Sequence, residues 1–273
     1  HGVPQFMRSK EQHMLIHGVD TATWKGKEPR HADHGKGEWV KAAAGQLAYS
    51  KCSPGVRHEA LYHDLARDVF GLGQHVPLTA LFRHPTSDEV MSVQRAVPGA
   101  RHPSYTIDRK IGKHVPMGAE GDVLKRLGDA GQLDKLAIMD AVMGMNDRHS
   151  SNYVFTPGKG PELHLIDNEN IFRKFDAGDD AHDPDYVRAG IPDYVRHYGH
   201  ILGVKGAQLP IHPDAMTWAL GLDPAKLERA MHERGVRDGR IVDTTKRLLR
   251  LQHVFKLNPP GLMKHHIARI AEG

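Results

Sequence analysis

The sequence predicts an α+β chain organised in two lobes, a small strand-rich lobe and a larger helical lobe. Strand patterns dominate residues 38–95, helical patterns dominate the residues that follow, and Pro98–Gly99 marks a break between the two. We therefore expect an N-terminal lobe at 1–97 and a C-terminal lobe at 98–273. A chain of 273 residues is long enough to bury a substantial core.

The composition excludes several classes of protein. Apolar residues make up 39% and charged residues 26% of the chain, so disordered and fibrous proteins are excluded. No apolar run approaches the roughly 18 residues that span a bilayer. The single cysteine, Cys52, permits no intrachain disulfide, and residues 1–10 contain no signal core, so we expect a cytoplasmic location. Because the sequence begins without Met, we interpret its start as truncated.

The first lobe contains one strong helical pattern. Leu61, Leu65 and Val69 recur at i+4 and predict a helix over Val56–Phe70, which Gly71 ends. Residues 1–37 are polar and are expected to form an irregular arm with a short strand at His13–Val19. Residues 45–54 are expected to form a loop. Strands are expected at Glu38–Ala43, Leu78–Arg83 and Glu89–Arg95.

The second lobe is predicted to be mainly helical. Residues 100–120 and 175–214 are rich in Gly and Pro and are expected to be irregular. Two short strands are expected at Asn152–Phe155 and Leu163–Ile166. Helices are expected at Asp122–Leu127, Gln132–Met145, Ala215–Leu220, Ala225–Arg234, Ile241–Phe255 and Leu262–Ala271. Asp223 and Pro224 are expected to cap the helix at Ala225–Arg234.

Residues 143–172 carry the most informative arrangement of polar side chains. Asp147 and Asn152 lie in a polar turn after a helix, and Asp167 follows the apolar run of a strand. Carboxylate and amide oxygens are the ligands that Mg²⁺ prefers, with phosphate and water completing its shell. This arrangement suits phosphoryl transfer. The alternative is a capped turn and a solvated hairpin, in which Asp and Asn are also common.

The motif Asp147-Arg-His-Ser-Ser-Asn152 resembles the catalytic loop of the phosphatidylinositol 3- and 4-kinases. Leu-Ile-Asp167-Asn-Glu-Asn-Ile-Phe resembles the metal-binding segment of the secretory-pathway (Golgi casein kinase) family, and HipA-type kinases share the layout. The resemblance implies an atypical protein-kinase-like fold that transfers the γ-phosphoryl group of ATP to a hydroxyl. It also implies that Asn152 and Asp167 bind Mg²⁺ and that Asp147, with His149, orients or deprotonates the acceptor.

The resemblance extends upstream to the nucleotide-binding residues. Lys41 lies where these families place the strand lysine that contacts phosphate, and Glu59 lies where its partner glutamate is expected. Arg95, Ala96 and Val97 would form the hinge beside adenine.

The sequence also departs from the family pattern. No clear Gly-rich phosphate loop precedes Lys41, and Asn168 and Glu169, not Phe and Gly, follow Asp167. Glu169 is interpreted either as a further metal or phosphate-site residue or as a surface group.

Several alternatives remain open from the sequence. The departures are also compatible with a pseudokinase or nucleotide-binding interaction module, and an AMP-transferring enzyme on the same fold is a third alternative. A basic nucleic-acid-binding protein is less favoured, because Lys246, Arg247 and Arg250 lie on a helix whose Leu residues indicate an ordinary solvated face. Zinc is not expected at His58 and His63, because their i+5 spacing places them on different helix faces. The acceptor (protein, lipid or small molecule) and the oligomeric state are not predicted.

Overall fold

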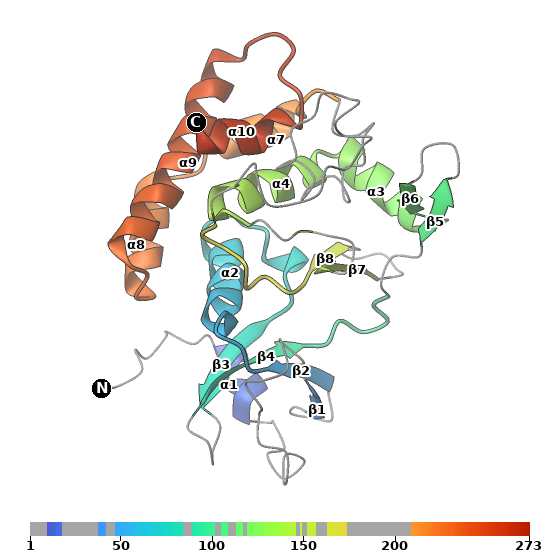
Figure 1. Ribbon diagram of the computed structural model, residues 1–273, viewed down its shortest axis with the longest axis vertical. Coiled ribbons are helices and arrows are strands. Elements are labelled where there is room, and N and C mark those ends of the chain that lie inside the picture. The colour runs from blue at the N-terminus through green and yellow to red at the C-terminus, as the bar shows by residue number, and fades with distance from the viewer. Residues whose placement is uncertain are drawn as a thin grey trace.

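The computed structural model describes residues 10–17, 38–41, 47–83, 89–101, 105–108, 113–116, 119–145, 148, 152–156, 163–173 and 209–273. A small antiparallel sheet lies at one end of the molecule, and most of the helices lie at the other (Figure 1). The α+β class predicted from the sequence is confirmed. Within the described residues, no helix is both long and apolar enough to cross a membrane.

The main sheet has four antiparallel strands in the order β1-β2-β4-β3. The strands are β1 (Glu38–Lys41), β2 (Leu47–Lys51), β3 (Thr79–Arg83) and β4 (Val90–Arg95). Lys51 of β2 lies opposite Ser92 of β4, and Tyr49 lies opposite Gln94. Because side chains alternate along a strand and directly paired residues share a face, these four side chains project from the same face of the sheet.

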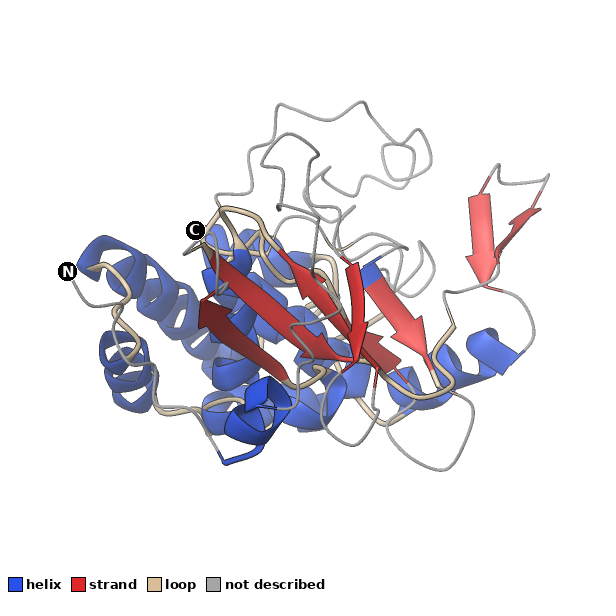
Figure 2. Ribbon diagram, turned by 90° about the horizontal axis from the view of Figure 1, so that it is seen from below, coloured by secondary structure: helices blue, strands red, loops and turns tan. Residues whose placement is uncertain are grey.

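Two helices cover opposite faces of this sheet. Helix α2 (Val56–Asp68) follows β2 directly, and its Val56 and Ala60 pack against Leu81 of β3. Helix α1 (Lys10–His17) lies on the other face, where Leu15 packs with Val40 and Val93. Seen from below, most of the other helices lie behind the sheet (Figure 2).

The structure corrects two expectations in this part of the chain. The strand expected at His13–Val19 is helix α1, since the short apolar run Met14–Ile16 fits either period and Leu15 is buried under the sheet. The loop expected at 45–54 contains strand β2. Its residues on the α1 face, Ala48 and Ser50, are small, so the strand lacks the alternation of large apolar residues that sequence reading relies on.

The remaining elements build the helical part of the molecule. They are a short 3₁₀ helix η3 (Gly73–His75), hairpins β5 (Tyr105–Asp108) with β6 (Lys113–Pro116) and β7 (Tyr153–Phe155) with β8 (Leu163–Leu165), and helices α3 (Ala119–Asp129), α4 (Gln132–Met143), α7 (Pro213–Leu220), α8 (Pro224–Glu233), α9 (Asp238–Leu257) and α10 (His266–Glu272).

Local chemistry explains several of these boundaries. The Asp223 side chain accepts a hydrogen bond from Ala225 N–H with Pro224 at the first helical turn of α8, as the sequence predicted. Hairpin β5–β6 lies in 100–120, where only irregular chain was expected. Of the segment 175–214, also expected to be irregular, residues up to 208 lie outside the described part of the chain, and α7 begins at Pro213.

Helix α2 packs against the sheet through Val56 and Ala60 and against the larger of two apolar cores through its other side. The larger core joins Leu61, Leu65 and Phe70 to residues of α4, of the β7–β8 hairpin and of helices α7 to α10. The smaller core lies between the sheet and α1. Helix α4 is the centre of the larger core, with Ile138 and Met139 fully buried. Helix α2 therefore connects the sheet to the helical core, and the predicted boundary at 97/98 stays a prediction.

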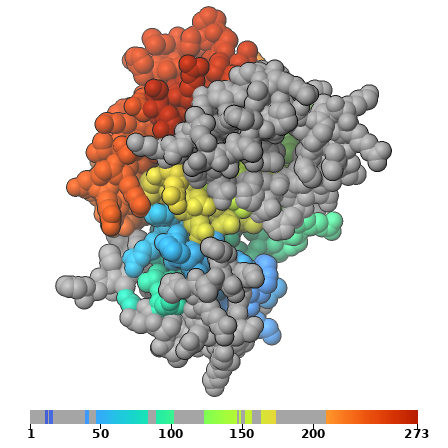
Figure 3. Space-filling view, in the orientation of Figure 1, coloured from blue at the N-terminus to red at the C-terminus, as the bar shows by residue number. Residues whose placement is uncertain are grey.

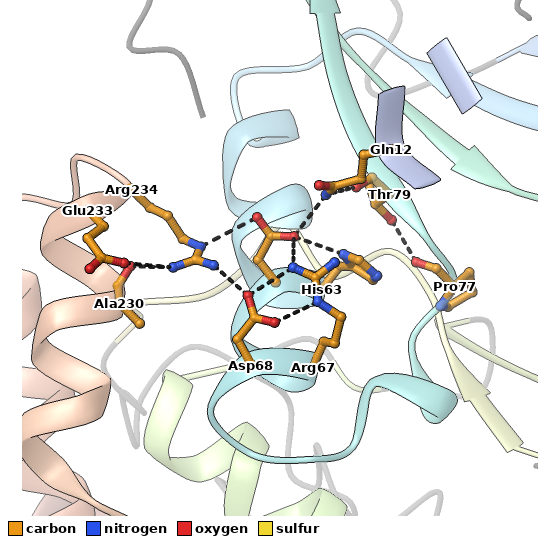
Figure 4. A network of polar contacts seen from close by, with 10 residues as sticks. Gln12, His63, Arg67, Asp68, Pro77, Thr79, Ala230, Glu233 and Arg234 are labelled. Carbon is orange, nitrogen blue, oxygen red and sulfur yellow. Dashed lines mark hydrogen bonds and ion pairs between the residues drawn. The ribbon is translucent and has the colours of Figure 1, made fainter. Parts of the chain in front are cut away.

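Polar contacts also fasten α2 to the C-terminal helices. Arg234, which follows α8, donates to Asp68 of α2 (Nη2 to Oδ2, 2.6 Å) and to Asp64 (Nε to Oδ2, 3.4 Å) (Figure 4). Asp64 also accepts from Gln12 Nε2 of α1 at 2.9 Å. This network, which we call the α2 clamp, holds one side of α2 against two other helices.

Candidate active site

The side chain of Lys51, on strand β2, contacts the residues that follow the β7–β8 hairpin. Its Nζ lies 2.5 Å from Oδ1 of Asp167 and 3.1 Å from Oε2 of Glu169, although both carboxylates are more than a hundred residues away in sequence. The lysine side chain is 6% exposed. Burial alone would lower the pKa of Lys51, but the carboxylates of Glu59, Asp167 and Glu169 outweigh it and raise that pKa above its ordinary value. Lys51 is therefore charged at any physiological pH.

Glu59 lies beneath this lysine on the first turns of α2. Its carboxylate is buried, and it accepts from Ser92 Oγ at 3.4 Å, from Gln94 Nε2 at 3.5 Å and from the backbone N–H of Asn168. Burial raises the pKa of Glu59 to about 7, although the charge of Lys51 opposes this. Glu59 is thus the buried member of a group of three carboxylates around one lysine.

Asp167 is held in an unusual backbone conformation at the end of β8. Its φ is +54°, in the left-handed region that side chains other than Gly, Asn and Asp rarely adopt. Its side chain is 42% exposed, so one carboxylate both contacts Lys51 and faces solvent. Such strain concentrates where a side chain is aimed at a ligand.

Glu169 is fixed against the start of α2. Its carboxylate accepts from Ser53 Oγ, and its backbone carbonyl contacts His58 Nδ1 at 3.0 Å. A Cβ on Gly55 would lie 2.7 Å from Cβ of Glu169, so only glycine fits there without displacing one of the two. Figure 3 shows residues of this hairpin (yellow) on the surface, between α2 (cyan) and the C-terminal helices (orange).

Arg148 connects helix α4 to the residues on both sides of Asp167 by hydrogen bonds and an ion pair. Its guanidinium is fully buried and forms a two-pronged ion pair with Asp140 of α4, at 3.0 and 3.1 Å. It also donates to the carbonyl oxygens of Asn152 (2.9 Å) and Ile166 (3.0 Å) and to Oδ1 of Asn168 (2.7 Å). Burial opposes the charge, but Asp140 and Tyr62 raise the pKa of Arg148, which stays charged. Arg148 thus fixes the residues on both sides of Asp167.

The structure brings together some of the residues predicted from sequence. Asn152 is buried at the base of the hairpin, and its carbonyl accepts from Ile166 N–H at 3.0 Å, which places it beside Asp167. Glu59 lies at the site as expected. Asp147 and His149 lie outside the described residues, so their predicted roles stay predictions. Arg95 is the last residue of β4 and Ala96 and Val97 follow it; Ala96 N–H donates to the Leu47 carbonyl at 3.0 Å.

Lys41 is not brought to this group of residues. It is exposed on the outer strand β1, opposite Leu47, whereas Lys51 on the next strand contacts Asp167 and Glu169. Sequence reading missed Lys51 because it assigned 45–54 to a loop. The sequence offered little signal for this strand, because Ala48 and Ser50 do not form an alternation of large apolar residues.

The oxygens at this site fit a magnesium ion. Three carboxylates surround a single ammonium group, so the site carries excess negative charge. Asp167, together with Asn152, would supply a small number of hard oxygen ligands, and phosphate and water would complete the octahedral shell that Mg²⁺ demands. Within the described residues, no group of three or more His, Cys, Asp and Glu side chains forms a self-sufficient metal cage.

Comparison with known proteins gives matches among solved structures only; no family model and no curated protein matches the chain. The proinflammatory kinase CtkA of Helicobacter pylori matches at 13% identity and a TM-score of 0.44, over 90% of this chain and 95% of CtkA. The N-terminal fragment of LepB from Legionella pneumophila matches at 13% identity and a TM-score of 0.38, over 86% of this chain and 44% of the fragment.

A chain of the HipA–HipB toxin–antitoxin complex of Shewanella oneidensis MR-1 matches at 12% identity and a TM-score of 0.34, over 100% of this chain and 72% of that one. TM-scores below 0.5 do not establish a shared fold. We therefore infer the function from the residues of the site.

Proposed function

We propose that this chain is a magnesium-dependent phosphotransferase that transfers the γ-phosphoryl group of ATP to a hydroxyl. The observation that carries the proposal is the contact of Lys51 Nζ with the carboxylates of Asp167 and Glu169, above the buried Glu59. A buried, permanently charged lysine beside a solvent-facing carboxylate supplies the two groups that hold a metal-bound polyphosphate.

Each residue has a separate role in this proposal. Lys51 binds the phosphates, and Glu59 and Glu169 hold its ammonium group in place. Asp167 and Asn152 would hold Mg²⁺, which supplies charge neutralisation of the transferred group when bound. Asp147, with His149, would orient or deprotonate the acceptor hydroxyl. Arg148 fixes the backbone on both sides of Asp167 and touches neither nucleotide nor metal.

Thermal melting with and without Mg²⁺ and ATP tests the nucleotide site. A ligand at a hundredfold excess over its Kd stabilises the native state by about 2.7 kcal/mol. Mg²⁺ and ATP together should therefore raise the Tm of the wild type and of Lys41→Met. They should not raise the Tm of Lys51→Met or Asp167→Asn. Asn suits the left-handed backbone of residue 167, so this variant removes the charge without adding strain. Circular dichroism checks that each variant is folded.

The two lysine variants make a matched pair. Both lysines lie on the same face of the same sheet, one exposed and one buried, and each variant removes one positive charge. Loss of the ATP response in Lys41→Met and its retention in Lys51→Met would reverse the assignment. A wild type that does not respond to saturating Mg²⁺ and ATP would refute the proposed function.

Mass spectrometry of reaction products separates phosphoryl transfer from AMP transfer, because the two groups add different masses. Nucleotide-dependent stabilisation without any product would favour the pseudokinase alternative. The departure that supports that alternative, Asn168 after Asp167, has a structural role here: its side chain binds Arg148 and the Leu165 carbonyl.

A further inference from the structure

A cavity of about 640 Å³ lies between helices α9 and α10, at the end of the molecule away from the sheet (Figure 1). Its walls are mainly apolar and are formed by Leu249 and Val254 of α9, Ile270 of α10 and Leu262 of the segment between the two helices. Leu249 is 49% exposed, and the other three side chains are partly buried. The volume lies in the range of cavities that hold small organic molecules, roughly 300–1,000 Å³.

Basic side chains border this cavity, and none of the described residues that line it is acidic. Lys246, His253 and Arg269 form no hydrogen bond or ion pair with another described residue. The carboxylate of Glu272, on α10, pairs with Arg247 at 2.9 Å, and Arg247 is not part of the lining. The positive charge at the cavity is therefore left without a counter-charge within the described part of the chain.

Two further polar side chains at the cavity have fixed orientations. Nη1 of Arg250 donates to two carbonyl oxygens at the C-terminal end of α10, at 3.1 and 2.6 Å. Nδ1 of His266 accepts from Met263 N–H at 3.1 Å, so the neutral ring carries its proton on Nε2, where it is a donor. Burial lowers the pKa of His266, and His265 and Arg269 lower it further. A negative charge placed in the cavity would therefore meet donors and cations only.

We propose that this cavity binds a free amphiphile with one acyl chain and an anionic head group, such as a fatty acid. The acyl chain would lie against the four apolar side chains, and the head group would accept hydrogen bonds from the basic side chains. Charge complementarity selects the anionic head group, and the apolar walls select the chain. This inference is independent of the proposed function, because none of these residues belongs to the site around Lys51.

Two other occupants fit these observations less well. A helix that lies on a membrane presents exposed apolar residues along one face, whereas three of the four apolar side chains here are partly buried around a cavity. Nucleic acid would use the same cations, since its backbone binds Lys and Arg, but it does not need apolar walls. Vesicles and an oligonucleotide are therefore included among the probes.

Calorimetry with fatty acids below their micelle concentrations tests the contact with the chain. Each methylene that leaves water should tighten binding by about 4-fold, so each step from octanoate to decanoate to dodecanoate should tighten it by about 15-fold. Leu249→Asp should weaken decanoate binding by more than about tenfold, because it removes an apolar wall and adds a negative charge. Leu257→Asp is the matched control: Leu257 is 66% exposed on the same helix but outside the cavity, so this variant should bind decanoate like the wild type.

Uncharged decanol tests the contact with the head group. Lys246→Gln and Arg269→Gln should each weaken decanoate binding by about 2- to 5-fold, as loss of an exposed charge pair does, and leave decanol binding unchanged. Lys256→Gln is the control, because Lys256 is exposed on α9 outside the cavity, and it should change neither affinity. Asp167→Asn should bind decanoate like the wild type, which separates this cavity from the site around Lys51.

Several results would overturn the inference. Absence of fatty-acid binding to the wild type, or equal affinity for octanoate and dodecanoate, would show that the cavity buries no acyl chain. Equal losses in Leu249→Asp and Leu257→Asp would place the bound chain elsewhere on the protein. Sedimentation with phosphatidylglycerol vesicles, or binding of a single-stranded oligonucleotide, without binding of free decanoate would assign the basic side chains to a membrane or to nucleic acid. Binding that grows with chain length and is lost only in Leu249→Asp would support the inference, whether or not ATP binds at Lys51.

Discussion

Replacing the buried Arg148 by methionine should be among the most destabilising single changes in this chain. The variant Arg148→Met keeps much of the side-chain volume and removes the guanidinium. It leaves Asp140, which is 1% exposed, without its cationic partner, and leaves the Ile166 carbonyl oxygen and Oδ1 of Asn168 without the donor that Arg148 supplies. An uncompensated charge and two unsatisfied acceptors then remain in the core.

The expected loss follows from those contacts. Removing one partner of a buried ion pair costs about 3–5 kcal/mol, because the remaining charge stays buried. That is a large part of the 5–15 kcal/mol by which such domains are stable. The double variant Arg148→Met/Asp140→Leu removes both charges, and an apolar replacement of a whole buried pair is often neutral. We therefore expect the double variant to be more stable than Arg148→Met.

Urea unfolding at constant pH measures these differences, since the free energy of unfolding falls linearly with denaturant. If Arg148→Met does not fold, Arg148→Lys is measured in its place, because it keeps the positive charge and loses only the planar guanidinium. Lys125→Met is the control: its pair with Asp129 on α3 is exposed, and such pairs contribute about 0.3–0.5 kcal/mol. A loss below about 1 kcal/mol for Arg148→Met, or additive effects in the double variant, would refute this account.

Two further variants test the ionisation of Glu59 and the α2 clamp. Because the pKa of Glu59 rises from 4.5 to about 7 on folding, the native state binds more protons between these values, and stability falls as pH rises through them by about 3 kcal/mol. The free energy of unfolding of Glu59→Gln, measured with urea, should therefore not show this decline between pH 5 and pH 8. Arg234→Met should lower stability by about 1–3 kcal/mol, because the half-buried Asp68 and the buried Asp64 each lose a charged donor.

Each of these variants has a matched control on α8. Glu228 is exposed, so Glu228→Gln should keep the decline in stability between pH 5 and pH 8. Arg229 pairs with Asp223 at 3.8 Å in solvent, so Arg229→Met should change stability by less than about 0.5 kcal/mol. A Glu59→Gln variant with the same pH dependence as wild type would show that Glu59 is ionised in the native state throughout. Equal losses for Arg234→Met and Arg229→Met would contradict the structural role of the clamp.

Strong periodic patterns identified much of the fold. The i+4 spacing of Leu61 and Leu65 indicated α2, and Asp223–Pro224 indicated the start of α8, because both patterns are set by contacts within a few residues. Helix α1 and strand β2 were misread for a different reason. Their identity depends on distant partners: Leu15 is apolar in either conformation, and β2 is a strand because β1 and β4 flank it.

The same distinction explains what could be predicted of the site. Asp167 was identified from the apolar strand that precedes it, and Glu59 from its place at the start of a helix. Lys51 was missed because its role arises from contacts with Asp167 and Glu169, which no local pattern contains. The burial of Arg148 against Asp140 of α4 likewise became visible only in the structure.

The position of α2 between the sheet and the helical core has a consequence for how the segment that carries Lys51 and Glu59 folds. One side of α2 places Glu59 under the sheet, and the other buries Leu61 and Leu65 in the helical core. A chain that ended at residue 97 would expose that second side to water, where burying two leucines is worth about 3–6 kcal/mol. The segment that carries Lys51 and Glu59 is therefore not an autonomous folding unit. Its geometry depends on contacts with helices that begin more than a hundred residues later in the chain.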